Sequence, residues 1–247
     1  MKQIALDIGM EAPPTLANFF VAPTGTANPA ALAHLQHWLF AGAPDGSAAC
    51  QPPTLFTPVY LWGEQASGKT HLLRAAYHAL QAQSPQAAHA VGWLDANVIE
   101  PPAFNPAWTA VLLDDVHLYS EAQQAMAFNW FVQLHSGDPA HVKGVLAAGR
   151  LPPADLPLRE DLRTRLGWGH VFALDVLSEP QRRAVLRQAA DARGLFLSDE
   201  VMDFMLTRFS RDLGNLMQLL QALDAYALRT QRALTIPLIR AMLEDAP

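Results

Sequence analysis

The sequence contains one cysteine, no run of basic residues and no apolar stretch long enough to cross a membrane. Because Cys50 has no second cysteine to pair with, an internal disulfide is excluded, which suits a reducing compartment. Residues 1–7 are too polar and too short for a secretory signal, and a membrane-spanning helix needs about 20 apolar residues. These absences predict a cytoplasmic protein with no membrane partner.

Charge is spread unevenly along the chain. Residues 1–149 hold four Lys or Arg against ten Asp or Glu, whereas residues 150–247 hold thirteen of each, so the net charge of −6 arises in the first part. Without a basic stripe, tight DNA binding by this chain alone is disfavoured. The arginines of the second part are expected to serve helix faces and subunit contacts; they include Arg163, Arg165, Arg182, Arg183 and Arg187.

Residues 63–70 form a complete phosphate-loop motif, Gly-Glu-Gln-Ala-Ser-Gly-Lys-Thr. A short apolar, β-rich run precedes it at 58–62, and helical spacing follows at 71–80, which is the strand–turn–helix context that the motif requires. Such a loop turns backbone N–H groups toward phosphate oxygens at the positive end of a new helix. The expected nucleotide-binding residues are Gly63, Glu64, Gln65, Ala66, Ser67, Gly68, Lys69 and Thr70. Lys69 would reach the β- and γ-phosphates, and Thr70 would offer its hydroxyl to Mg²⁺.

A second pattern typical of nucleotide-binding proteins is the unbroken apolar run at 110–113, which is followed directly by Asp114 and Asp115. A central parallel strand delivers acids to its C-terminal edge in this way. Asp114 fits the Walker B role of holding Mg²⁺, and Asp115 fits a residue that orients the attacking water. Alone, two aspartates after a strand are more often a helix cap or a turn; beside a phosphate loop the metal site is favoured.

Alternating strand and helix patterns predict an α/β fold, a parallel sheet flanked by helices. Residues 1–28 have little periodicity and are expected to form an extended arm, and residues 29–175 the nucleotide-binding domain. From 176 to 247 the period is helical only, which predicts a small all-α domain. Its helix boundary signals are Ser178 with Gln181, Gly194, Ser198, Asp212, and Thr235 with Pro237.

The phosphate loop, the Walker B strand and the trailing helices together resemble the AAA+ class. Residues 161–169, Asp-Leu-Arg-Thr-Arg-Leu-Gly-Trp-Gly, resemble the box VII segment of replication initiators of the DnaA family, and the resemblance extends over roughly residues 16–245. It implies that Arg165 is an arginine finger acting in trans on the nucleotide of a partner. The alternative for Arg165 is an intramolecular salt bridge.

The N-terminal peptide at residues 3–8, Gln-Ile-Ala-Leu-Asp-Ile, resembles the motif that docks on the sliding clamp of DNA polymerase. Gln3 would bond in one subsite while Leu6 and Ile8 fill an apolar pocket; a disordered arm or an added edge strand is the alternative. By this resemblance, the protein is also expected to lack the DNA-reading domain that follows the helical part of an initiator. This combination resembles the family's regulatory inactivators, which implies DnaA and the clamp as partners, contact with DNA only through the clamp, and stimulated hydrolysis of DnaA-bound ATP that blocks re-initiation. Homo-oligomerisation stays open.

Two departures from the family pattern predict weak or absent ATPase activity of the chain itself. The sensor 1 region is Ala-Ala-Gly-Arg at 147–150, without an acid or amide, and the sensor 2 arginine is replaced by Gly214. Arg150 or Arg211 could compensate. Bound ADP or ATP is therefore expected to act as a conformational ligand. The alternative functions are an autonomous AAA+ ATPase, such as a helicase loader or remodeller, and a DNA-binding fragment of an initiator.

Overall fold

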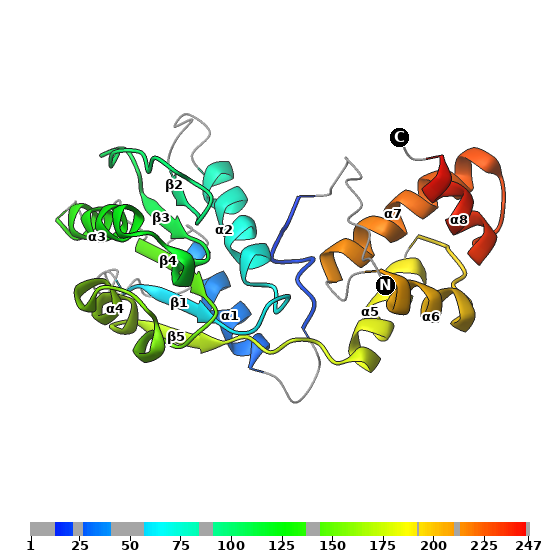
Figure 1. Ribbon diagram of the computed structural model, residues 1–247, viewed down its shortest axis with the longest axis horizontal. Coiled ribbons are helices and arrows are strands. Elements are labelled where there is room, and N and C mark those ends of the chain that lie inside the picture. The colour runs from blue at the N-terminus through cyan, green and yellow to red at the C-terminus, as the bar shows by residue number, and fades with distance from the viewer. Residues whose placement is uncertain are drawn as a thin grey trace, which may run out of the picture. The chain divides into compact units, whose positions relative to one another are not determined.

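The computed structural model describes residues 13–21, 27–40, 57–83, 91–136, 144–191, 193–209 and 213–245. They divide into two compact units, one from Pro13 to Val176 and one from Leu177 onward. We call the first the sheet unit and the second the helical unit, and each is described by itself (Figure 1).

The sheet unit is built on a five-stranded sheet in the order β2-β3-β4-β1-β5, in which all four strand pairs are parallel. Its elements in chain order are α1 (Asn28–Phe40), β1 (Val59–Trp62), α2 (Lys69–Gln83), β2 (Val91–Leu94), β3 (Ala110–Leu113), the 3-10 turn η1 (Val116–Leu118), α3 (Glu121–His135), β4 (Gly144–Gly149), the 3-10 turn η2 (Pro153–Asp155), α4 (Glu160–Gly167) and β5 (His170–Ala173). Because the strands are parallel, their C-terminal ends meet at one edge, where ligands of such sheets bind.

Side-chain alternation along the strands separates two hydrophobic cores. Alternate residues of the central strands, such as Val111 and Leu113, face α3 and α4, where Trp130 and Leu162 are fully buried. The intervening residues pack on α1 and α2 and include Leu61, Leu112 and Leu146. Figure 1 shows these helix pairs on the two faces of the sheet. Strands buried on both faces explain the continuous apolar runs of the sequence, and the predicted parallel α/β fold is confirmed.

The helical unit contains α5 (Glu179–Asp191), α6 (Asp199–Arg208), α7 (Leu213–Thr230) and α8 (Ile236–Glu244) around a core that includes Met202, Leu216 and Ile239. The predicted caps are present at two helices: Ser198 accepts from Val201 N–H, and Thr235 accepts from Leu238 N–H. These bonds satisfy backbone N–H groups that the first helical turn leaves unpaired. The small all-α architecture predicted for this part of the chain is confirmed.

Two local features differ from the sequence-based expectation, and a third cannot be compared. Residues 13–21, expected to be extended, contain a turn in which Thr15 and Asn18 exchange side-chain to backbone hydrogen bonds of 2.8 and 3.1 Å. The helix α5 ends at Asp191 rather than at Arg193, because the chain reverses at Gly194, whose φ of 69° favours glycine. The predicted helix start at Asp212 lies outside the described residues.

Candidate nucleotide-binding site

The phosphate loop joins β1 to α2 at the C-terminal edge of the sheet. Its glycines occupy positions that a larger residue could not fill: a Cβ on Gly63 would lie 2.3 Å from Leu174 O, and one on Gly68 would lie 2.6 Å from the Phe19 ring. Gly68 also has a φ of 91°, a conformation that residues with a side chain rarely adopt. Glu64, Gln65 and Ala66 are exposed, whereas Ser67 is buried.

Lys69, the first residue of α2, is buried, and its side chain points back toward the phosphate loop. Its ammonium donates to the carbonyl oxygens of Gly63 and Glu64, both at 2.8 Å, and to Ser67 Oγ at 3.3 Å. Burial lowers the pKa of Lys69, while Asp115, Asp114 and Glu64 oppose that shift. The cation is therefore held at the loop by polar contacts, in reach of anions that the loop would cradle.

Asp114 follows β3 directly and lies beside Thr70 of the phosphate loop. The Asp114 carboxylate is hydrogen-bonded by the Thr70 side chain and accepts from Asp115 N–H at 3.0 Å, and Asp114 N–H donates to Leu94 O at 2.8 Å. Burial raises the pKa of Asp114 to about 6. A carboxylate and a hydroxyl side by side fit Mg²⁺, which prefers oxygen ligands and takes few of them from protein. Among the described residues, no group of three or more His, Cys, Asp and Glu could hold a metal ion.

Asp115 adopts a left-handed backbone conformation, with φ of 49° and ψ of 41°, and begins the turn η1. Such a conformation is uncommon for a residue other than glycine, although Asp tolerates it better than most, and it is frequent at functional sites. Its side chain makes no capping bond to η1. Asp115 therefore lies at the start of a turn, which was one of the alternatives for the aspartate pair, but its side chain does not cap that turn.

Arg150 lies at the C-terminal edge of the sheet that carries the phosphate loop, which we call the nucleotide edge. Its guanidinium forms an ion pair of 2.9 Å with Glu64 of the loop. The end of β4 is fixed beside the loop because Gly63 N–H donates to Gly149 O at 3.3 Å and Tyr60 Oη donates to Leu151 O at 2.7 Å. Arg150 and Glu64 are both well exposed, so the pair itself contributes little to stability. Arg211, the other residue considered for a sensor role, lies outside the described residues.

One part of the site escaped the sequence analysis: the turn of residues 13–21 packs against the phosphate loop and the start of α2. The Phe19 ring lies against Gly68 and 5.7 Å from the His71 ring, and His71 Nε2 lies 3.1 Å from Thr15 O. The segment has no helical or strand period, so no pattern in the sequence signalled this contact. The available hint was the apolar group Leu16, Phe19, Phe20 and Val21 in a stretch without helical or strand period.

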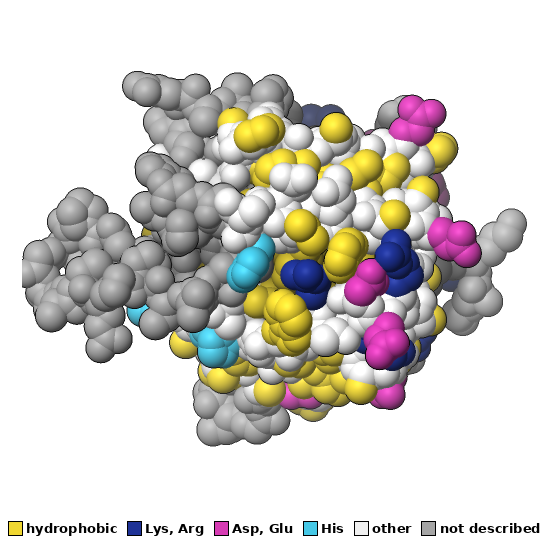
Figure 2. Space-filling model, turned by 90° about the vertical axis from the view of Figure 1, so that its left-hand side faces the viewer, with side chains coloured by type: hydrophobic (Ala, Val, Ile, Leu, Met, Phe, Trp, Pro, Cys, Tyr) yellow, Lys and Arg dark blue, Asp and Glu magenta, His cyan; other side chains and the backbone are white. Residues whose placement is uncertain are grey.

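Arg165 lies on α4, and its contacts are aromatic. Its guanidinium carbon is 4.9 Å from the centroid of the Phe128 ring and 5.1 Å from that of Trp168. Among the described residues, no carboxylate forms an ion pair with Arg165. Figure 2 shows the face at the α3 and α4 end of the sheet unit, where basic side chains lie directly beside hydrophobic ones.

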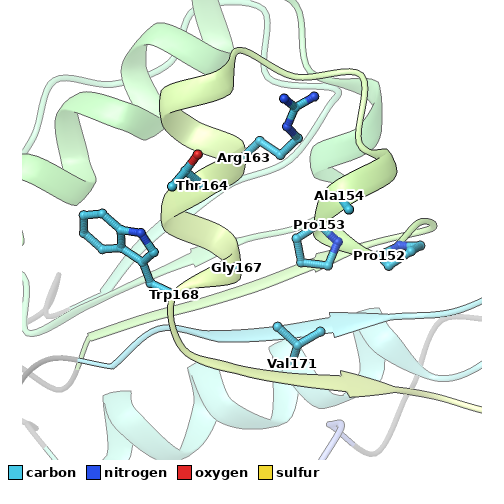
Figure 3. A pocket seen from close by; sticks show the side chains of 8 residues that line it. All are labelled: Pro152, Pro153, Ala154, Arg163, Thr164, Gly167, Trp168 and Val171. Atoms are coloured by element: carbon cyan, nitrogen blue, oxygen red, sulfur yellow. The ribbon is translucent and has the colours of Figure 1, made fainter.

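A hollow of about 520 Å³ lies beside Trp168, one of the two rings that Arg165 contacts. Figure 3 shows η2 on one side of the hollow, α4 on the other and Val171 of β5 below; its lining residues are Pro152, Pro153, Ala154, Arg163, Thr164, Gly167, Trp168 and Val171. Trp168 is 61% exposed, which is unusual for so large an apolar side chain. An exposed aromatic beside an arginine is a composition typical of protein interfaces.

Three predicted site residues, Gln3, Leu6 and Ile8, lie outside the described residues. The structure thus brings the phosphate loop, Asp114, Asp115 and Arg150 together at one edge of the sheet, and places Arg165 on a separate element. Among the helices of the described residues, none is long and apolar enough to span a membrane.

The chain is similar to proteins of replication initiation. The family model "Hda, lid domain" matches residues 179–243. An uncharacterized protein of Haemophilus influenzae is 32% identical over 190 residues, which cover 74% of this chain and 80% of that protein. The chromosomal replication initiator DnaA of Psychromonas ingrahamii is 29% identical over 221 residues, covering 83% of this chain and 48% of the initiator, so the chain spans about half of that relative.

Solved structures of DnaA share the fold. Domain III of Thermotoga maritima DnaA matches with a TM-score of 0.64 at 21% identity, covering 94% of this chain and 95% of that one. AMPPCP-bound DnaA from Aquifex aeolicus matches with a TM-score of 0.61 at 20% identity, covering 90% of this chain and 68% of the other. At these identities the likeness is one of architecture.

Proposed function

The chain belongs to the DnaA-related AAA+ family and carries an Hda-type lid domain, and on that premise we propose that it is a nucleotide-binding regulator of replication initiation. It docks on the DNA-loaded sliding clamp and stimulates hydrolysis of the ATP bound to DnaA, which prevents re-initiation. The proposed organisation is an N-terminal segment at residues 1–28, which carries the clamp peptide and whose residues 13–21 pack on the phosphate loop, an AAA+ domain at 29–175 and a lid at 176–247.

The observation that carries the proposal is the environment of Arg165. Its guanidinium lies between Phe128 and Trp168 rather than in an ion pair with a described carboxylate. Ring faces hold a cation in place by roughly 0.5–1 kcal/mol at exposed sites and leave its N–H donors available. An arginine presented in this way suits a trans arginine finger, which must reach an anion on another subunit.

We propose that the nucleotide, ADP or ATP, binds at the phosphate loop through residues 63–70. Lys69 would exchange its loop carbonyl partners for phosphate oxygens, and Thr70 and Asp114 would hold Mg²⁺. When bound, Mg²⁺ would neutralise phosphate charge. The AMPPCP reported for the Aquifex aeolicus DnaA structure supports nucleotide binding in this fold.

Turnover by the chain itself should be slow. The last residues of β4 are Ala147, Ala148 and Gly149, which carry no side chain able to position water, and Arg150 is paired with Glu64. Hydrolysis in this class depends on positioning and charge stabilisation, so a site without these groups retains nucleotide more readily than it cleaves it.

The decisive experiment follows hydrolysis of DnaA-bound ATP in the presence of clamp-loaded DNA, with and without this protein. Wild-type protein should accelerate hydrolysis, and Arg165→Ala should lose most of the acceleration, since arginine fingers contribute about 10³–10⁵ in rate. Arg165→Ala should bind nucleotide as the wild type does, because the finger serves the partner's site.

Arg159→Ala is the matched control, because Arg159 also lies near the Phe128 ring, at 5.7 Å, but is paired with Asp161 at 2.7 Å. Normal stimulation by Arg165→Ala would refute the finger, and equal losses in both variants would indicate a surface effect. Brisk ATP turnover by the isolated protein would favour an autonomous AAA+ ATPase instead.

A further inference from the structure

The nucleotide edge of the sheet contains a polar residue that no motif assigns, His117 of η1. The turn η1 packs against the end of β4, where Val116 Cγ2 lies 3.1 Å from the position of a Cβ on Gly149. Gly149 O in turn accepts the 3.3 Å bond from Gly63 N–H. The turn, the strand end and the first residue of the phosphate loop therefore meet at one corner, and His117 follows Val116 directly.

His117 Nδ1 is shielded from solvent and forms no hydrogen bond with any described residue. Buried polar atoms in native proteins almost always have a partner, so an orphaned nitrogen beside a ligand site suggests that its partner belongs to the ligand or to ordered water. The imidazole as a whole is only half-buried. Its χ2 torsion is broad, so a rotation can present a ring nitrogen toward the edge of the sheet.

The charged groups that act on His117 are those of the nucleotide edge. Burial lowers the pKa of His117, Asp115 opposes this effect, and Lys69 and Arg150 reinforce it. A neutral imidazole carries one N–H donor and can bond a phosphate oxygen. His117 is thus within electrostatic range of Lys69, proposed above for the β- and γ-phosphates, and of Asp115, expected to orient the attacking water. Together with the packing of η1 on the end of β4, this points to the terminal-phosphate side of the loop.

We propose that His117 belongs to the nucleotide site and donates a hydrogen bond to the terminal phosphate of a bound nucleoside triphosphate, so that the protein distinguishes a triphosphate from a diphosphate. This role supplies the polar contact that Ala147, Ala148 and Gly149 lack at the end of β4. The inference rests on the nucleotide binding proposed above and assigns to His117 the recognition of nucleotide state.

Calorimetric titration with AMPPCP and with ADP, each with Mg²⁺, tests this role. His117→Ala should weaken AMPPCP binding by about 10- to 100-fold, the loss for a hydrogen bond to a charged group, and should leave ADP binding nearly unchanged. His117→Asn keeps a donor close to the Nδ1 position and should restore part of the preference. Leu118→Ala, a neighbouring exposed residue of the same turn, should bind both nucleotides as the wild type does.

A second readout does not depend on affinity. In ¹⁵N-labelled protein, the His117 ring resonances, assigned by their absence from His117→Asn, should shift on addition of AMPPCP and not of ADP. Equal weakening of both nucleotides in His117→Ala, or no change in either with unshifted resonances, would overturn the proposal and leave His117 with a structural or water-mediated role. Wild-type protein that binds neither nucleotide would overturn the proposed nucleotide site as well. Wild-type binding without DnaA stimulation would overturn only the regulatory function.

Discussion

Lys69 is the single residue on which nucleotide binding should depend most. Lys69→Ala removes the cation that loop carbonyls now hold, and should weaken ADP and ATP binding by about 2–3 kcal/mol, roughly 30- to 150-fold. Calorimetry measures this directly. His78→Ala, exposed on the same helix, is the control. An unchanged affinity in a folded Lys69→Ala protein would mean that nucleotide binds elsewhere.

The Asp114 carboxylate, which we propose as a Mg²⁺ ligand, should lower the free energy of unfolding of the Mg²⁺-free protein at neutral pH. Its native pKa of about 6 lies above the ordinary value of 3.8, so the native state binds more protons than the unfolded state between these pH values, and stability falls as pH rises through that window. Neutral Asp114→Asn should therefore stabilise the Mg²⁺-free protein at pH 7, by up to about 3 kcal/mol, with the gain shrinking toward pH 4.

Urea unfolding with chelator at pH 7 and pH 4 measures the Asp114→Asn effect. The same substitution should weaken Mg²⁺-dependent binding of nucleotide, because an amide oxygen carries no charge. A variant that is less stable than the wild type at pH 7 would show that the carboxylate is stabilised, rather than destabilised, by its surroundings.

The start of α3 shows how one helix end organises the segment beside it. Ser120 and Gln123 form a capping box, and Gln123 Nε2 also donates to the carbonyl oxygens of Asp95, Ala96 and Val98 at 2.8–3.2 Å. The amide thus fixes the chain that leaves β2. Ser120→Ala should cost about 1 kcal/mol.

Gln123→Ala should destabilise more than Ser120→Ala, because it leaves three partly buried carbonyl groups without this donor. A fully desolvated carbonyl without a donor costs about 1–3 kcal/mol, and partial exposure to water lowers that cost. Chemical denaturation of both variants gives the two free energies of unfolding. Equal losses would mean that solvent replaces the amide at those carbonyls, and that the segment after β2 is held by its other contacts.

At the scale of the whole molecule, the N-terminal segment and the AAA+ domain should act on different partners. If Gln3, Leu6 and Ile8 dock on the clamp, the contact is one extended peptide, of about micromolar affinity, roughly −8 kcal/mol. On DNA this suffices, because tethering raises the local concentration near DnaA. Replacing Gln3 and Leu6 with Ala should abolish clamp binding and clamp-dependent stimulation while sparing nucleotide binding.

Surface-based binding to the clamp checks the arm, with a deletion of residues 1–9 beside the double substitution. Clamp binding that survives the deletion would place the contact elsewhere on the surface. Loss of nucleotide binding in either variant would contradict the separation of the two activities.

The sequence alone determined those structural features that depend on residues close together along the chain. The phosphate loop between 58–62 and 71–80, the apolar strand before Asp114, and the caps at Ser198 and Thr235 each depend on residues a few positions apart, because a strand, a turn or a helix end is specified locally. The parallel α/β fold followed from the alternation of such signals.

Only the tertiary structure decided the contacts between distant segments. Arg150 pairs with Glu64 86 positions away, Phe19 covers Gly68, Arg165 lies over the Phe128 ring, and the turn η1 packs on the end of β4. In each pair the two residues lie on different strands, helices or turns. The spacing of residues along the sequence does not predict which of these elements the order of the sheet brings into contact. The parallel topology aligns the ends of β1, β3 and β4 at one edge, and this alignment decides which polar side chains share a site.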